Sequence, residues 1–433
     1  MAVRGEDFLL GRYKTMRLAS VALLVLADTL CAQDAVRSAR TAENEPGPLA
    51  ANAPADRGIS FPVTINAEVL GNFAGGTSRR AIWQSLWNVG FAIDLEKAVG
   101  WKGGSMIARG LYGHGSGLTS VAVHDFNTLS NIDTYDSLRL YETWLQQTFG
   151  DGKFSIRVGQ LLADVEFFDS NYAAIFLNSA FGAIPLVSQN VNPPIFPIAA
   201  PGLRLRAEPS ENFYAEVACF SGDVGAPDTT NKHNTRLTFP GSDGTLIFAE
   251  IGYRWNPPHP GHASPETTGD PPLSGTYKLG GYYDSKAFTN VDGGPGHGGE
   301  YSVYFVADQE LWHPESNAER ALSFFTRVGF APEDRSTVSL YADVGLNFRG
   351  WCAGRPGDTV GLGFSHTQLS PNLRDDSGRG LRAHHEMICE LTYQAVLSPN
   401  LSIQPDLQFI FTPGATQPAA TAVVSGLRVN LTF

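Results

Sequence analysis

The last eight residues of the chain alternate strictly between apolar and polar side chains. The apolar positions are Leu427, Val429, Leu431 and Phe433, and the polar positions are Gly426, Arg428, Asn430 and Thr432. A period of two places these sets on opposite faces of a β-strand. A soluble sandwich would bury the apolar face in a protein core. A transmembrane barrel would instead turn that face to lipid and turn Arg428 toward water.

The same alternation recurs from Phe61 onward, in about sixteen segments. They span residues 62–72, 84–95, 104–113, 137–148, 153–161, 202–207, 212–220, 245–256, 275–286, 299–311, 320–330, 337–349, 359–367, 385–397, 400–412 and 422–433. In each segment where the alternation is clear, the charged residues lie on one face of the predicted strand. An even number of strands is typical of bacterial outer-membrane barrels whose two chain ends lie in the periplasm. We therefore predict an all-β fold, a transmembrane antiparallel β-barrel of about sixteen strands.

Composition argues against the other way of crossing a membrane. Charged residues make up 17% of the chain, against about 25% in typical soluble domains. No segment beyond the N-terminal region contains about 18 consecutive apolar residues, so a helical membrane protein is not expected. A closed barrel is the remaining structure that satisfies every backbone group inside a bilayer.

The N-terminus has the features of a secretory signal peptide, because basic residues precede an apolar run over residues 18–27. We predict that residues 1–32 are this signal peptide. Residues 33–60, rich in Ala, Pro, Asn and Glu, are predicted to form a flexible periplasmic leader. Residues 61–433 are then the barrel domain. Export and barrel formation together predict the outer membrane of a Gram-negative bacterium.

Residues 162–201 form a long segment without clear strand alternation between two predicted strands. Forty residues exceed ordinary loop lengths, which indicates a folded functional loop. Its aromatic residues are too numerous to lie free in solvent: Phe167, Phe168, Tyr172, Phe176, Phe181 and Phe196.

Several motifs resemble the carbohydrate-selective porin family, of the OprB type. The most specific block comprises YETWLQQTFGDGKFSIRVGQ at 141–160, DVEFFDS at 164–170, NSAFG at 178–182, FP at 196–197 and AAPGLRLR at 199–206. Shorter matches are GGYY at 280–283, FTRVG at 325–329, RPGDTVGLG at 355–363 and the closing strand. The resemblance covers roughly residues 61–433. It implies a sixteen-stranded outer-membrane barrel that passes glucose and related sugars.

In porins the loop after the fifth strand folds into the lumen and narrows it, and residues 162–201 follow the fifth predicted strand. The resemblance therefore suggests a pore constriction with acidic side chains on one wall and arginines opposite, and aromatic rings that stack on sugar. The predicted solute-contacting residues are Arg157, Asp164, Glu166, Phe168, Asp169, Arg204 and Arg206. Each charged residue has an alternative role. The arginines could only brace a wet lumen, and the acids could only tether the loop.

The predicted function is passive diffusion of small hydrophilic solutes, with monosaccharides such as glucose as partners. It needs no cofactor, no metal and no covalent chemistry, so an enzyme is not expected. The net charge of −12 argues against nucleic acid, which requires clustered positive charge. Further expected partners are outer-membrane lipid and the barrel-assembly machinery, which reads a terminal aromatic residue such as Phe433.

Alternatives stay open at this point. One is a plugged, structural or adhesive outer-membrane barrel without solute transport. Another is an exported soluble β-rich enzyme acting on polysaccharide. The sequence leaves the oligomeric state open between monomer and trimer.

Overall fold

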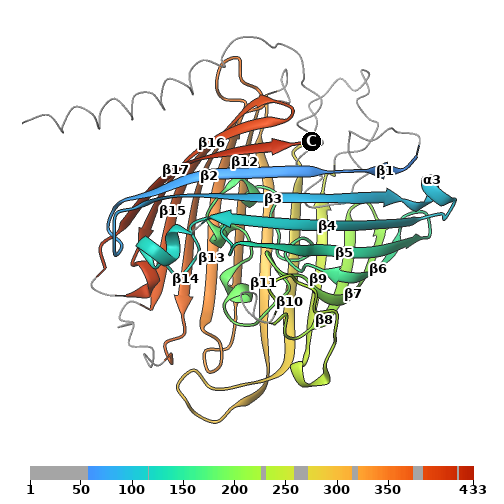
Figure 1. Ribbon diagram of the computed structural model, residues 1–433, viewed down its shortest axis with the longest axis horizontal. Helices are drawn as coiled ribbons and strands as arrows, with labels where there is room; N and C mark the ends of the chain where they lie inside the picture. The colour runs from blue at the N-terminus through green and yellow to red at the C-terminus, as the bar shows by residue number, and fades with distance from the viewer. Residues whose placement is uncertain are drawn as a thin grey trace, which may run out of the picture.

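The strands of the protein close into one antiparallel barrel. The computed structural model describes residues 57–115, 117–225, 231–257, 272–314, 320–373, 384–416 and 419–433. The barrel strands are β2 (Val63–Ala74), β3 (Ala81–Asp94), β4 (Gly104–Gly115), β5 (Ser137–Phe149), β6 (Phe154–Leu161), β7 (Ala200–Ser210), β8 (Phe213–Ser221), β9 (Thr245–Trp255), β10 (Gly275–Phe288), β11 (His297–Trp312), β12 (Ala321–Phe330), β13 (Val338–Arg349), β14 (Thr359–Leu369), β15 (His385–Ser398), β16 (Leu401–Phe411) and β17 (Ala422–Thr432). Each strand pairs with its neighbours in sequence, and β17 pairs with β2 to close the ring (Figure 1). The predicted fold of about sixteen strands is confirmed.

The strand alternation separates a lipid-facing surface from a polar interior. Inward-facing Asp343 and Glu390 are buried, whereas outward-facing Val344 and Leu391, the next residues along their strands, are exposed. The same contrast repeats around the ring, which leaves a continuous apolar outer surface. This is the arrangement that a barrel in a bilayer requires.

The two ends of the barrel differ in the length of their connections. Both described chain ends lie at one end, which we call the terminus end, with tight turns at 150–153 and 399–400. This end also carries helix α3 (Leu95–Val99). The connections at 116–136, 162–199 and 222–244 lie at the opposite end, which we call the long-loop end.

The N-terminal boundary differs slightly from the prediction. Residues 1–56, which include the predicted signal peptide and most of the leader, lie outside the described residues. Ile59 and Ser60 were assigned to the flexible leader, but they form the short strand β1 (Ile59–Ser60), which pairs with Ile93 and Ala92 of β3. Backbone pairing along β3 therefore begins before the predicted barrel boundary at Phe61.

Within the described residues, the short helices other than α3 also lie in the connections. They are η1 (Thr119–Val123), η2 (Ala173–Ile175), η3 (Ser179–Phe181), α4 (Pro185–Ser188), η4 (Gly241–Asp243) and η5 (Pro413–Ala415). Among the described residues, no helix is both long and apolar enough to cross a membrane.

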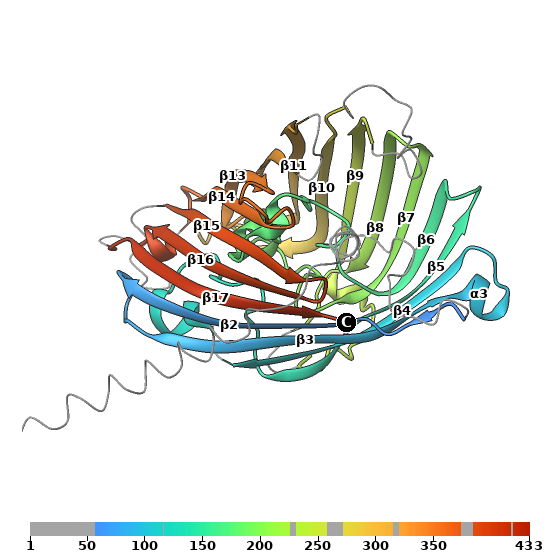
Figure 2. The same ribbon diagram turned by 90° about the horizontal axis from the view of Figure 1, so that it is seen from above.

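The 162–199 connection occupies the interior of the ring (Figure 2). Phe167 stacks on Phe248 of β9 with ring centroids 5.2 Å apart, and Phe176 packs on Phe325 of β12 at 5.5 Å. All four rings are buried. Four of the aromatic residues that looked too apolar for a free loop, Phe167, Phe168, Phe176 and Phe181, are thus buried in a packed core between the loop and the inner wall.

Candidate solute-binding cavity

A cavity of about 870 Å³ lies between this loop and the inner wall of the barrel. Its lining strands contribute mostly residues near the terminus end, and the 162–199 loop borders it on the other side. Six of the seven predicted site residues line it, namely Arg157, Asp164, Glu166, Asp169, Arg204 and Arg206. The structure therefore brings these charged side chains to one cavity.

The arginines of β6 and β7 hold Glu166 of the loop directly. Arg157 forms an ion pair with Glu166, and Arg204 Nε lies 2.9 Å from Glu166 Oε2. Burial alone would raise the pKa of Glu166, but the guanidinium groups of Arg157 and Arg204 outweigh it and hold that pKa below its usual value. Glu166 was expected to lie across an opening from these arginines. The structure corrects this, because acid and base are in contact on one wall.

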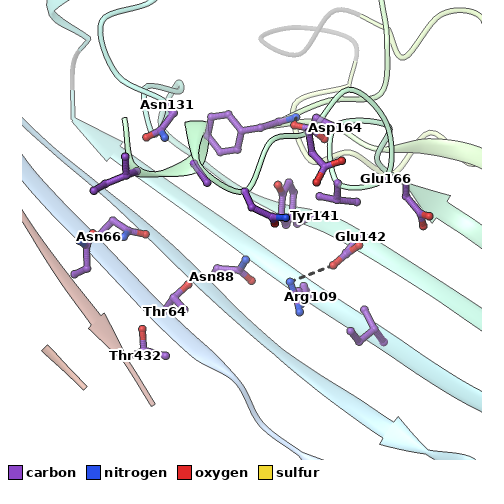
Figure 3. A pocket seen from close by; sticks show the side chains of 18 of the residues that line it. Thr64, Asn66, Asn88, Arg109, Asn131, Tyr141, Glu142, Asp164, Glu166 and Thr432 are labelled. Atoms are coloured by element: carbon purple, nitrogen blue, oxygen red, sulfur yellow. Dashed lines mark hydrogen bonds and ion pairs between the residues drawn. The ribbon is translucent and has the colours of Figure 1, made fainter. Parts of the chain in front are cut away.

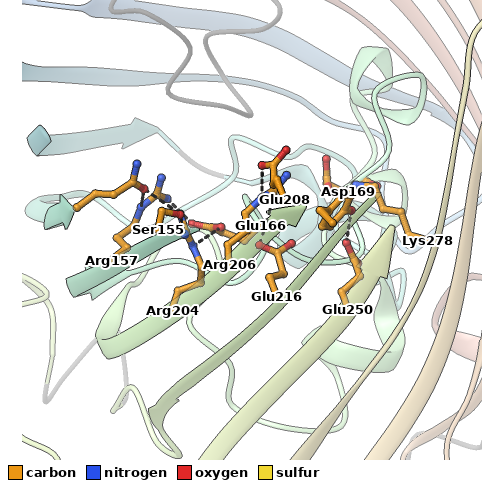
Figure 4. A network of polar contacts seen from close by, with 12 residues as sticks. Ser155, Arg157, Glu166, Asp169, Arg204, Arg206, Glu208, Glu216, Glu250 and Lys278 are labelled. Carbon is orange, nitrogen blue, oxygen red and sulfur yellow. Dashed lines mark hydrogen bonds and ion pairs between the residues drawn. The ribbon is translucent and has the colours of Figure 1, made fainter. Parts of the chain in front are cut away.

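A second charged cluster continues this wall toward β9 (Figure 4). Arg206 Nε lies 2.7 Å from Glu208 and its Nη1 lies 3.2 Å from Glu216. Arg254 Nη1 lies 2.8 Å from the other carboxylate oxygen of Glu208. Both guanidinium groups also lie over the ring of Tyr214, at 4.2 and 5.1 Å from its centroid. The charges on this wall are thus matched locally, in clusters where arginines and carboxylates share partners.

Asp169 has a partner that sequence reasoning missed. Lys278 of β10 forms an ion pair with the Asp169 carboxylate and donates a hydrogen bond to its backbone carbonyl at 3.1 Å. Lys278 is an inward-facing residue of the predicted strand 275–286, so alternation alone placed it in the lumen. Nothing in the sequence indicated which loop carboxylate it meets.

Asp164 connects the two ends of the loop. Its Oδ2 accepts a hydrogen bond of 2.9 Å from the backbone N–H of Phe196, and Ala163 N–H donates to Pro194 O nearby at 2.6 Å. Burial raises the pKa of Asp164 to about 6, although the Phe196 N–H acts in the opposite direction. We call this region, residues 163–164 and 194–196, the loop neck.

Phe168 does not fit the predicted contact with solute. Its ring is fully buried and is not part of the cavity lining. It packs against Phe248 and Tyr304, with centroids 5.9 Å away in each case. Its backbone has a positive φ of 49°, a conformation uncommon for a bulky residue. The turn directs the ring toward the barrel wall rather than into the cavity.

The part of the cavity formed by β16, β17, β2 and β3 is chemically different. Its described lining residues there are mainly amides and hydroxyls: Thr64, Asn66, Asn88, Ser402, Gln404, Asn430 and Thr432, with Arg428 among them. Asn66 Nδ2 donates to Asn430 Oδ1 at 2.6 Å, and Asn430 Nδ2 donates to Ser402 Oγ at 3.1 Å. We call this surface the amide wall (Figure 3). It lies several strands away from the charged wall of β6–β10 around the ring.

The loop is anchored by wall residues that the sequence analysis did not single out. Arg327 of β12 forms an ion pair of 2.6 Å with Asp343. It also donates to the backbone carbonyls of Phe168, Ala180 and Gly182 at 3.3, 3.2 and 2.7 Å. Arg327 and Asp343 are direct cross-strand partners. Their opposite charges at inward positions of adjacent strands were the signal that could have identified them.

Carboxylates of the wall accept backbone N–H groups of the loop in the same way. Glu250 of β9 accepts from Phe168 N at 3.0 Å, and also from the hydroxyls of Tyr214 and Tyr304 at 2.7 and 2.9 Å. Glu390 of β15 accepts from the backbone N–H groups of residues 177 and 178 at 2.5 and 3.0 Å. These contacts satisfy the polar groups that a buried loop must otherwise leave unpaired.

Comparison with known proteins supports this picture. Porin B of Pseudomonas aeruginosa is 23% identical over 420 residues, covering 87% of this chain and 88% of that protein. The putative porin QuiX of Acinetobacter baylyi is 21% identical, covering 87% and 90%. The high-pH structure of Pseudomonas putida OprB superposes with a TM-score of 0.77 at 22% identity, covering 88% of this chain and 95% of that one.

Residues 81–433 match the family described as carbohydrate-selective porin, OprB family. This range includes most of the barrel, the entire 162–199 loop and the charged wall. The chain therefore belongs to the carbohydrate-selective porin family of the OprB type, and it is an outer-membrane β-barrel of a Gram-negative bacterium.

Proposed function

We propose that the protein is a passive diffusion channel for small uncharged sugars, with monosaccharides such as glucose as its solutes. The observation that carries the proposal is the pairing of two chemically different surfaces around one cavity. A wall of locally matched ion pairs lies on β6–β10, and an amide wall lies on β16, β17, β2 and β3.

Matched charges suit a neutral polyol better than an ion. Because Glu166 is neutralised by Arg157 and Arg204, this wall presents donors and acceptors without a large excess of one charge. Such groups replace water around sugar hydroxyls, and the contacts stay weak enough for the solute to leave. We assign this contact role to Arg157, Asp164, Glu166, Asp169, Arg204 and Arg206. Passage requires no bond to be made or broken, so the channel acts without catalysis.

One observation favours a second candidate, a plugged barrel. At the long-loop end the interior is filled by buried side chains of the 162–199 loop, including Phe176, Phe181, Leu186 and Val187. If this packing blocks every route, the barrel has a structural role only. The cavity at the terminus end and the polarity of its walls favour the channel.

Liposome swelling separates the two candidates. Purified, folded protein is reconstituted, and the vesicles are exposed to glucose, a disaccharide or a salt at equal osmolarity. We expect rapid swelling with glucose and slower swelling with the disaccharide. Vesicles that contain folded protein but do not swell with glucose would contradict the channel and support the plugged barrel.

A further inference from the structure

Four aromatic side chains of the described residues line the cavity, and they differ in how far their rings are buried. Arg157 lies over the ring of Trp144 at 4.1 Å, and two guanidinium groups lie over Tyr214. Both of these rings are buried. Tyr141 of β5 and Phe196 of the loop neck are instead partly exposed within the cavity. They contact each other edge to face, with centroids 6.3 Å apart.

These two rings lie at the innermost part of the cavity. Together with Leu86, Leu111 and Ile132 they form a small apolar cluster that is separate from the main packed core. Leu86, Leu111 and Tyr141 are the lining positions farthest along their strands from the terminus end. The end of the cavity farthest from the terminus end is thus lined by an aromatic pair between the barrel wall and the loop neck.

Polar groups surround this pair (Figure 3). Asp164 accepts the backbone N–H of Phe196 itself, Arg109 Nη1 lies 3.3 Å from Glu142, the residue after Tyr141, and Asn131 lies on the neighbouring 116–136 connection. Within the part of the chain that the structure describes, Asp164 Oδ1 and Arg109 Nε are buried without a hydrogen-bond partner. Unsatisfied polar atoms beside a partly open aromatic surface are a feature of a ligand site rather than of a finished core.

We infer that Tyr141 and Phe196 form a binding subsite for a pyranose ring, with Asp164, Arg109 and Asn131 as partners for its hydroxyl groups. A pyranose in its chair form has an apolar C–H face and a rim of hydroxyls. The aromatic pair matches the face by dispersion and burial of apolar area, and the polar groups match the rim. The inference rests on the proposed sugar channel and identifies where within it the ring form of the solute is recognised.

The test uses the full protein in planar bilayers, with the sugar-dependent decrease in ion current as the measure of an apparent dissociation constant. Glucose is compared with sorbitol, which has similar hydroxyl groups on an open chain and no ring face. The variants are Phe196→Leu and Tyr141→Leu, which keep apolar volume but remove the aromatic surface. Phe330→Leu is the control, because Phe330 is 56% exposed on the outer surface of β12.

For the wild type and Phe330→Leu we expect glucose to bind more tightly than sorbitol. In Phe196→Leu and Tyr141→Leu, glucose affinity should fall about fivefold to the level of sorbitol. Wild-type glucose affinity in both variants, with sugar flux intact, would overturn the subsite and leave the channel function standing. Absence of any sugar flux through the wild type would overturn the proposed function itself, and this subsite with it.

Discussion

Two regions of the barrel interior, one around the packed 162–199 loop and one around the cavity, are lined by similar charged side chains. The partners of these side chains differ between the two regions. Around the packed 162–199 loop, Arg327, Glu250 and Glu390 form hydrogen bonds with the loop backbone. At the border of the cavity, Arg204 and Arg206 are held by carboxylates. Inward-facing charges in this protein therefore differ in what they bind: some bind the loop backbone, whereas Arg204 binds the Glu166 side chain of the loop where it borders the cavity.

The largest predicted effect is a loss of folding stability when Arg327, which binds the loop backbone, is replaced. Arg327→Met leaves Asp343 buried without its cation and frees three loop carbonyls, so the free energy of unfolding should fall by about 3–5 kcal/mol. Chemical denaturation in detergent, followed by the loss of β-structure, measures it. Arg80→Met, at the exposed β2–β3 turn, should cause little change. A variant of Arg327 as stable as wild type would show that the loop is not held from this wall.

A smaller loss of stability is expected for Glu250, a wall carboxylate that accepts a hydrogen bond from the loop backbone. Glu250→Gln turns an acceptor of three hydrogen bonds into a group that must present an amide N–H₂ to some of the same donors. The expected loss is about 1–3 kcal/mol, together with faster proteolysis of the 162–199 loop. The exposed Glu333→Gln serves as the reference. Equal protease resistance of the two variants would contradict an anchoring role for Glu250.

For the cavity-lining arginines, we expect substitution to change permeation through the channel rather than folding stability. Arg204→Ala combined with Arg206→Ala removes two positive charges from the cavity wall and leaves the Glu216 carboxylate without its arginine, while Glu166 keeps Arg157. The cation-to-anion permeability ratio, measured from the reversal potential in a salt gradient, should therefore rise several-fold. Glucose swelling rates should also change. Arg79→Ala with Arg80→Ala removes the same charge from an exposed turn. If both double variants conduct identically, the wall of β6 and β7 does not contact solute.

The smallest effect concerns pH at the loop neck. Because the folded pKa of Asp164 is raised to about 6, the folded state holds a proton there that the unfolded chain, with its ordinary carboxyl pKa, has released. The stability contributed by this group is complete in acid and is lost as the pH rises through about 6. Asp164→Asn should flatten this part of the stability curve between roughly pH 4 and 7. A curve of unchanged slope would show that another group titrates there.

The sequence was sufficient for the fold because alternation repeats in every strand. The predicted segments 137–148 and 337–349 differ little from β5 (Ser137–Phe149) and β13 (Val338–Arg349). Because alternate residues of a strand point inward, each inward-facing position could be identified from its place in the alternation alone. The long loop was also evident, as its observed limits of 162–199 show.

The pairing of inward side chains could not be read in the same way. Parity places Lys278 and Arg327 in the lumen, but their partners Asp169 and Gly182 belong to a loop whose path depends on packing. Phe168 illustrates the limit most clearly. An aromatic residue beside predicted ligands was expected to contact sugar, yet the turn at this residue buries it against Phe248 and Tyr304.

The closure of the ring also has a consequence for how the molecule comes into being. The seam between β17 and β2 joins Phe433 to Val63 by two backbone hydrogen bonds of 3.1 and 2.8 Å, so its partners come from opposite ends of the barrel sequence. Contacts of such separation are slow to form, because the chain loses much entropy before they are made. Neighbouring hairpins are therefore expected to form early and the seam late. During that interval the 162–199 loop can settle against an open, curved sheet, so the filling of the lumen need not wait for its wall to be complete.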